Sequence, residues 1–179
     1  MTPATGSIPA LNVNESAFWR FSLKLYSQSD IPPICLHLQD QYGVDVNVLF
    51  FCLFLSVQQR LLESHTFNAV EKKAKIWRSN VVEPLRSVRK ILKTDLSTPN
   101  IPGCQKLREA IKKSELAAER LQQEMLEESF PVHHLLQANC IEIALKHNLA
   151  LYDKAIGPLP KPSLQTLTHI VLTIFLSPT

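Results

Sequence analysis

The sequence predicts an all-α protein, a single compact bundle of about six helices with one long charged helix and an irregular apolar C-terminal tail. The chain has 179 residues, of which 45% are apolar and 20% charged, so one domain with a real core is expected. It contains only 4 glycines against 12 prolines. Both residue types are poorly tolerated inside helices, and they leave long uninterrupted blocks at 10–31, 44–83, 104–130 and 132–156.

The positions of proline and glycine also divide the chain into three parts. We expect a flexible N-terminus over residues 1–13, a single helical domain over residues 14–157, and a proline-spaced C-terminal tail over residues 158–179.

Capping residues and prolines mark the expected limits of the first two helices. A helix from about residue 15 to 29 is expected after Asn14, a good N-cap. The second helix is expected to begin at Pro32 and Pro33, because first-turn amides have no intrahelical partner, and to end at Gly43.

The third helix is expected to start after Asp45, another good N-cap, and to form the centre of the fold. Residues 48–57 are apolar except for Ser56, which predicts burial on nearly every side. A membrane-spanning helix needs roughly 20 apolar residues, and this run ends at Gln58. A buried core helix is therefore favoured.

Two longer helical segments come next along the chain. Apolar residues recur at helical spacing from Phe67 to Val81, Pro84 is expected to end or kink this helix, and the apolar stripe continues to Leu92. Residues 104–129 alternate in charge around a thin apolar seam, which predicts a long and mostly solvated helix.

The last helix is expected to start at Pro131 and to stop before Gly157. Beyond it, the run from residue 164 to 176 is apolar and β-prone but too short to span a bilayer. It could pack on the domain, contact a partner or touch a membrane surface.

The composition excludes several enzyme classes. Four glycines are too few for a glycine-rich phosphate loop, a dinucleotide-binding fingerprint or a serine nucleophile elbow. The last helix carries His133, Cys140 and His147, but residues seven apart on a helix are separated by about 10.5 Å along its axis, too far to share one ion. Neither a cofactor nor a metal is expected.

The cysteines and the N-terminal composition favour a cytoplasmic protein. The first eighteen residues have no basic side chain and no apolar run, unlike a secretory signal. Cys35, Cys52 and Cys140 lie in apolar helical surroundings without a CxxC pair, as is typical of reduced, buried thiols. Cys104 lies at a helix start, where a thiolate is favoured, but we read it as an ordinary helix-start residue.

A compact polar group surrounds the turn between the second and third helices. Asp40, Asp45 and Asn47 could bind a divalent cation or act as acid and base. We favour caps and ion pairs instead. Asp45 precedes the core helix as a cap, and Asp40 lies in a last turn, where the helix dipole favours cations, so an arginine partner is expected for it.

Basic charge is concentrated in one segment. Residues 1–65 hold five acidic and three basic side chains, whereas residues 69–93 hold eight basic and two acidic ones. Helical spacing predicts a basic ridge that could meet an acidic protein, RNA or anionic lipid, or could simply be a solvated face. No nucleic-acid-binding motif, and no DNA-binding motif, accompanies it. The ridge comprises Lys72, Lys75, Arg86, Arg89, Lys90 and Lys93.

Several strings of the sequence resemble one family. The sequence reads FWRFSL at 18–23, CLHLQD at 35–40, GVDVN at 43–47, FFC at 50–52, WR at 77–78 and VVEPLR at 81–86. These blocks, with Arg89, Lys90, Leu92 and Lys93, resemble an uncharacterised proteobacterial family of small helical proteins with a domain of unknown function. The resemblance covers about residues 15–130 and implies no activity.

Three functions remain open from the sequence. The leading hypothesis is a non-enzymatic interaction protein that uses the basic ridge, with the charged helix as a second contact. The alternative is an enzyme with a polar site assembled across helices from Asp40, Asp45, Asn47, Arg86 and Arg89. A second alternative is association with a membrane surface through residues 164–176. Long charged helices occur in monomers and in coiled dimers alike, so the charged helix predicts neither.

Overall fold

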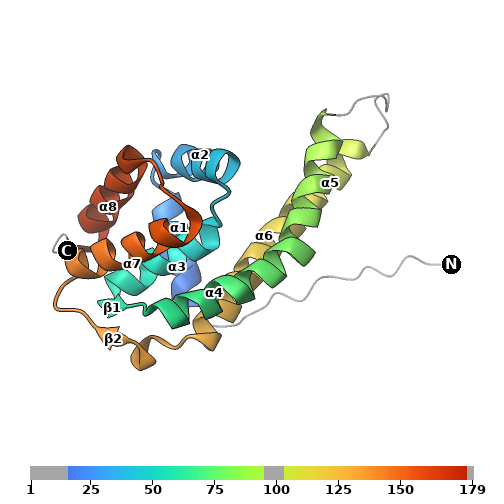
Figure 1. Cartoon of the computed structure of the whole chain (residues 1–179). Helices are drawn as coiled ribbons and strands as arrows, with labels where there is room; N and C mark the ends of the chain where they lie inside the picture. Colours follow the sequence, from blue (N-terminus) through green and yellow to red (C-terminus); the bar gives the residue numbers. More distant parts are fainter. Residues whose placement is uncertain (1–15, 95–102, 177–179) are drawn as a thin grey trace.

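The computed structural model describes residues 16–94 and 103–176, and this part of the chain is predominantly helical, which confirms the all-α fold (Figure 1). The flexible N-terminus expected over residues 1–13 lies outside the described residues. In chain order, the elements are α1 (Ala17–Tyr26), α2 (Ile31–Tyr42), α3 (Val46–Val57), β1 (Arg60–Leu61), α4 (Ser64–Trp77), η1 (Arg78–Val82), α5 (Glu83–Thr94), α6 (Cys104–Ser129), η2 (Val132–His134), β2 (Leu136–Gln137), α7 (Ile141–Ile156) and α8 (Lys161–Leu176).

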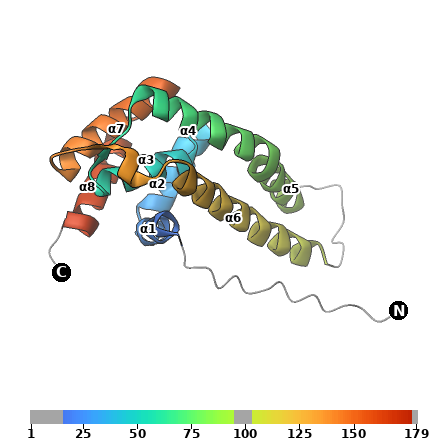
Figure 2. The ribbon, with the colours of Figure 1, turned by 90° about the horizontal axis from the view of Figure 1, so that it is seen from below.

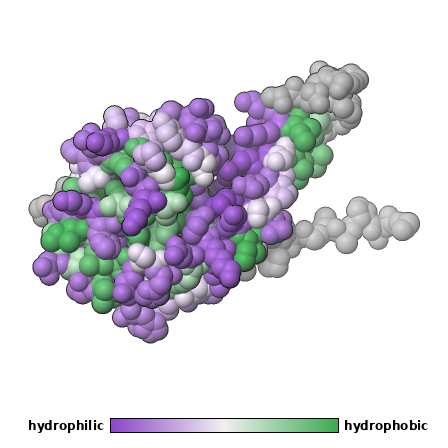
Figure 3. All heavy atoms as spheres, in the orientation of Figure 1, coloured by the Kyte–Doolittle hydropathy of each residue, from purple (hydrophilic) through white to green (hydrophobic). Residues whose placement is uncertain are grey.

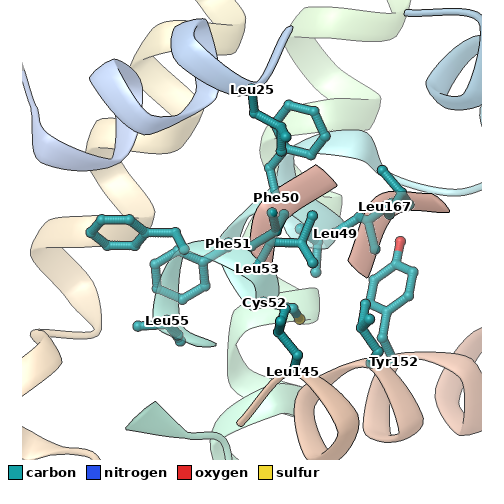
Figure 4. Packing of buried hydrophobic residues seen from close by; sticks show 14 of the residues in the cluster. Leu25, Leu49, Phe50, Phe51, Cys52, Leu53, Leu55, Leu145, Tyr152 and Leu167 are labelled. Carbon is teal, nitrogen blue, oxygen red and sulfur yellow. The ribbon is translucent and has the colours of Figure 1, made fainter. Parts of the chain in front are cut away.

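Helix α3 is the centre of the fold, as its apolar sequence predicts. Every side chain from Val48 to Ser56 is buried. Figure 4 shows several of these side chains, from Leu49 to Leu55, packed in one cluster with Leu25 of α1, Leu145 of α7 and Leu167 of α8. The helix begins where predicted, because Asp45 Oδ1 accepts hydrogen bonds from the backbone N–H groups of the first turn.

The end of α2 was predicted correctly, whereas the start of α1 was not. Helix α2 ends at Gly43 as expected, because that residue adopts a left-handed conformation with φ of 65°. Helix α1 is shorter than expected and its N-cap is Ser16 rather than Asn14. The Ser16 hydroxyl accepts a hydrogen bond from the Trp19 N–H at 2.9 Å, which fixes the start of the helix.

Pro84, which was expected to end or kink the helix, lies within a continuous helical stretch. The chain runs from α4 through the π-helical segment η1 into α5, where Pro84 occupies the first turn. In the wider π turn, the Glu83 N–H donates to the Arg78 carbonyl five residues back. The Ser79 and Asn80 side chains donate to carbonyls of the preceding turn, each at 2.7 Å.

Helices α5 and α6 form a hairpin that projects from the rest of the molecule. Figures 1 and 2 show the two helices side by side, extending away from the body made by α1, α2, α3, α7 and α8. Helix α6 has the limits predicted from its alternating charge, and its inner end packs against α1 and α3.

The segment after α6 departs from the expected single helix. Helix α7 begins at Ile141, not at Pro131. Between them, η2 leads into strand β2, which pairs antiparallel with β1. The Ala138 N–H also donates to the Gln59 carbonyl at 2.8 Å, so backbone pairing in this segment replaces helical hydrogen bonds.

The C-terminal segment is helical rather than irregular. Residues 161–176 form α8, which buries Leu167 and Val171 against the core. The Phe175 ring stacks on Phe21 of α1, with 5.0 Å between ring centroids. Among the described residues, no helix combines the length and the apolar character that crossing a membrane requires.

Candidate functional site

A cleft of about 600 Å³ lies between the body and the projecting hairpin. One side is formed by α1 and α2, the floor by the start of α3 and by η1, and the other side by α5 and α6. The hollow between body and hairpin is visible in Figure 3. Its volume falls in the range of sites that bind small molecules or peptide side chains.

One part of the cleft is apolar and open to solvent. Leu23, Tyr26, Leu36 and Leu116 line it and expose between 46% and 57% of their surface. Trp19 lies deeper and is buried. Soluble proteins rarely leave large apolar side chains grouped in one exposed patch unless the patch contacts another molecule.

An ionic cluster joins the two helices of the hairpin on the polar side of the cleft. Arg86 binds Glu115 at 2.9 Å and Glu119 at 2.7 Å, and Arg89 binds Glu115 as well. Burial opposes ionisation of Glu115, but hydrogen bonds from Arg89 and Arg86 outweigh it and lower its pKa. Burial raises the pKa of Glu119, despite the nearby Arg86 charge.

A second ion pair lies at the floor. The buried Asp45 carboxylate binds Arg78 of η1, which also reaches Glu71 at 3.4 Å. Burial raises the pKa of Glu71, whereas Arg78 acts in the opposite direction. Asp45 therefore combines a helix cap with an ion pair, which is the interpretation favoured from the sequence.

A chain of three side-chain amides starts at Asp45 and runs along the floor. Gln122 Nε2 donates to Asp45 Oδ2 at 3.1 Å, Asn47 Nδ2 donates to Gln122 Oε1 at 2.9 Å, and Gln123 Nε2 donates to Asn47 Oδ1 at 2.7 Å. At the far end, the buried Gln123 Oε1 has no hydrogen-bond partner among the described residues. The buried Ser22 hydroxyl, which also lines the cleft, has none there either.

The structure brings together most of the polar residues singled out in the sequence. Asp45, Asn47, Arg86 and Arg89 all line the cleft. Asp40 does not: its side chain is exposed, and within the described part of the chain it forms no ion pair with an arginine.

The predicted basic ridge is divided between two surfaces. Arg86 and Arg89 are half-buried and face Glu115 and Glu119 of α6. The ridge lysines are exposed on α4 and α5, outside the cleft lining; they are Lys72, Lys75, Lys90 and Lys93. Whether these lysines contact a partner stays a prediction.

Several cleft residues were not singled out as functional in the sequence. They come mainly from α6, where residues 109, 112, 116, 119 and 123 succeed one another at helical spacing on a single face. That spacing was visible in the sequence, but nothing in it showed which face of the charged helix meets α1 and α2.

Within residues 16–94 and 103–176, no group of three His, Cys, Asp or Glu side chains is arranged to hold a metal ion. Cys35 lies in the cleft wall, and burial raises the pKa of its thiol to about 12, so it stays protonated at neutral pH.

Comparison with known proteins identifies a family. No curated protein and no solved structure matches the chain. A family model described as a protein of unknown function (DUF2390) matches residues 17–126. All residues that line the cleft, from Trp19 to Gln123, lie within this match, whereas α7 and α8 lie beyond it. Because the match spans more than half of the sequence, the chain belongs to this family of proteins of unknown function.

Proposed function

We propose that this is a non-enzymatic binding protein whose cleft receives an acidic, partly apolar segment of a partner protein. The proposal rests on one observation. The same cleft is lined by exposed apolar side chains and by lysines that have no acidic partner among the described residues. An amphipathic peptide segment presents both chemistries at once.

The apolar part supports a peptide with large hydrophobic side chains. Leu23, Tyr26 and Leu36 face the cleft from the body, and Leu116 faces it from α6. Burying such side chains contributes about 25 cal/mol per Å² of apolar surface removed from water. Tyrosine and tryptophan are enriched at the energetic centres of interfaces, and Tyr26 and Trp19 occupy this wall.

The charge of the hairpin side supports an acidic partner. Lys112 and Lys113 line the cleft and are exposed, and neither forms an ion pair within the described residues. Glu109, the partly exposed carboxylate near them, already binds Arg108 at 3.2 Å. The charge left unbalanced here is positive, which favours encounter with acidic side chains.

The polar residues proposed for an enzyme are occupied in structural roles. Asp45 caps α3 and binds Arg78, and Glu115 binds both Arg86 and Arg89. Charged groups that already satisfy one another contribute to rigidity, and none of them is positioned as a nucleophile beside a free base. Protein binding is therefore better supported than catalysis.

A display library of random 16-residue peptides provides the test. We expect selection on the full chain to enrich sequences that combine Asp or Glu with large apolar residues. Synthesised consensus peptides should bind at least about tenfold more weakly to a Lys112→Glu/Lys113→Glu variant, since two attractive charge contacts become repulsive. A matched Lys146→Glu/Lys154→Glu variant, on the exposed face of α7, should bind as the wild type does.

The basic ridge and RNA are the other outcomes of this experiment. A Lys72→Glu/Lys75→Glu variant that loses binding while the cleft variant keeps it would overturn the cleft and favour the ridge. Enrichment of peptides without acidic residues would also overturn the proposal. Tight, salt-dependent binding of a random-sequence 40-nucleotide RNA, with no peptide enriched, would replace a protein partner by a nucleic acid.

A further inference from the structure

The amide chain at the cleft floor has a fixed direction. The Asp45 carboxylate binds Arg78 and can only accept hydrogen bonds, so Gln122 must present its N–H₂ group to it. The Gln122 oxygen then accepts from Asn47, whose oxygen in turn accepts from Gln123. Each amide has one donor end and one acceptor end, and the charge at Asp45 orients all three.

This direction leaves an acceptor without a donor at the end of the chain. Gln123 Oε1 is buried and unpaired within the described part of the protein, in a side chain that is only 3% exposed. Reversing the Gln123 amide would not help, because its oxygen would then face the Asn47 oxygen. A buried polar atom without a partner lowers the stability of the folded protein, so such atoms are uncommon unless something else supplies the partner.

A second unpaired group lies on the facing helix. Ser22 is 5% exposed, lines the same cleft, and its hydroxyl has no partner in residues 16–94 and 103–176. The register of α1 against α6 brings it opposite Gln123. The Phe18 N–H of α1 reaches the Glu127 carboxylate of α6 at 3.4 Å. Ser22 lies one turn after Phe18 on α1, and Gln123 lies one turn before Glu127 on α6.

We propose that Ser22 and Gln123 form a subsite for an uncharged amide group of the ligand, such as a peptide bond or a primary carboxamide. The Gln123 oxygen accepts the ligand N–H, and the Ser22 hydroxyl donates to the ligand carbonyl. A carboxylate lacks the donor that the Gln123 oxygen requires, and an ammonium group lacks an acceptor for the Ser22 hydroxyl proton, whereas an uncharged amide supplies both a donor and an acceptor. The inference rests on the cleft being a binding site, as proposed above, but not on the acidity of the partner.

The surroundings select against a charged ligand group at this place. The ionised side chains nearest the floor balance one another, Asp45 with Arg78 and Glu115 and Glu119 with Arg86 and Arg89. A buried charge needs an opposite charge, and none of these is free to supply it. The buried Trp19 ring lies in the same wall and offers an apolar surface to the group that carries the amide.

Two small probes of nearly equal shape test the subsite on the full-length, ¹⁵N-labelled protein. The probes are 3-phenylpropanamide and its methyl ester counterpart, which keeps the carbonyl but lacks the N–H. We expect the amide to shift the Gln123 side-chain and Trp19 indole signals in a saturable manner. The ester should bind about fivefold more weakly, the effect of one neutral hydrogen bond.

A Ser22→Ala variant provides the second arm. It removes a hydroxyl that has no partner among the described residues, so the variant should fold with a melting temperature equal to or above that of the wild type. The amide should bind about fivefold more weakly to it. A Ser27→Ala variant, whose serine lies on α1's C-terminal side outside the cleft lining and hydrogen-bonds the Lys24 carbonyl, should leave amide binding unchanged.

Three results would overturn the inference. They are equal affinity for amide and ester, unchanged amide affinity in folded Ser22→Ala protein, and no saturable shift at Gln123 up to the solubility limit of the amide. If the amide binds as expected while the peptide library yields no acidic sequence, the subsite stands and the proposed partner fails.

Discussion

Asp45 connects four parts of the molecule, namely α3, η1, α6 and α7. Its side chain caps α3, binds Arg78 of η1 and accepts a hydrogen bond from Gln122 of α6. Its backbone carbonyl accepts from the buried Tyr152 hydroxyl of α7 at 3.1 Å. The same residue therefore sets the start of the core helix and the position of the cleft floor.

Glu115 provides a test of the ion pairs in the hairpin. The pKa of Glu115 is lowered from 4.5 in the folded protein, so its ionised form stabilises folding above pH 4.5. This stabilisation is lost as the pH falls through the folded pKa. We expect Glu115→Gln to lower the free energy of unfolding by about 2 kcal/mol at pH 7. Urea denaturation across pH 7 to 3 should show the difference from wild type narrowing below pH 4.5.

The control for this measurement is Glu128→Gln. Glu128 is exposed on the same helix and forms no ion pair within the described residues, so the change should stay within about 0.5 kcal/mol at every pH. A difference between Glu115→Gln and wild type that does not vary with pH would contradict the role given to its charge.

For single residues, the sequence predicted helix caps better than it predicted ion-pair partners. A cap depends on residues two and three positions away, so Asp45 before an apolar run was sufficient evidence. The ion-pair partner of Asp45 is Arg78, 33 positions further along the chain, and its orientation depends on the π turn before Pro84. Spacing alone could not place Arg86 and Arg89 against Glu115 rather than on a solvent-facing ridge.

Among the elements, α7 holds the segment after α3 in place through one buried side chain. Asn148 is fully buried, and its Oδ1 accepts from the Leu62 N–H at 2.9 Å. Its Nδ2 donates to the Ser56 hydroxyl at 2.9 Å and to the Arg60 carbonyl at 2.8 Å. The end of α3, strand β1 and helix α7 thus meet at a single amide.

Replacing Asn148 with leucine keeps the number and branching of the side-chain heavy atoms but leaves these groups unpaired. We expect a loss of about 3 kcal/mol in the free energy of unfolding, together with faster hydrogen exchange of the Leu62 amide. Urea denaturation and native-state hydrogen exchange measure the two effects. The neighbouring exposed Lys146, changed to alanine, should alter neither. Unchanged protection of Leu62 in Asn148→Leu would show that this hydrogen bond is unimportant.

The elements themselves were predictable where periodicity was long. Helices α3 and α6 were predictable from a long apolar run and a long charged run, whereas the two-residue strands β1 and β2 are too short to give any periodic signal. Residues 164–176 look β-prone in isolation. They form a helix because Leu167, Val171 and Phe175 then meet the core and Phe21 on one face.

The molecule as a whole is larger than the family match. The match ends at residue 126, yet α3 packs more extensively against α7 than against any other element. Helix α8 covers a further part of the same core through Leu167 and Val171. The cleft belongs to the matched part, but the core that supports it depends on α7 and α8.

A fragment of residues 16–129 tests this dependence. Without α7 and α8, the apolar surface of α3 would face water, so we expect the fragment to retain helical far-ultraviolet circular dichroism while losing its near-ultraviolet signal and its cooperative urea transition. Residues 16–176 should retain all three. A fragment of 16–129 that unfolds cooperatively would contradict the prediction.

The cleft is the feature of the whole molecule that the sequence predicted least. Its walls come from four separate segments, and Trp19 and Gln123 are more than 100 residues apart in the sequence. Only the packing of α1 on α6 and the projection of the hairpin bring them together.

In the chain of side-chain amides, the residue that presents an atom to the ligand is Gln123, whereas the residue that orients the amides is Asp45. Carboxamides at Asn47, Gln122 and Gln123 would connect equally well in either orientation if both ends were neutral. The negative charge of Asp45 removes that symmetry, so the atom that Gln123 presents is set by a charge at the other end of the amide chain. A substitution far from the contact could therefore invert what the floor recognises while leaving the shape of the cleft unaltered.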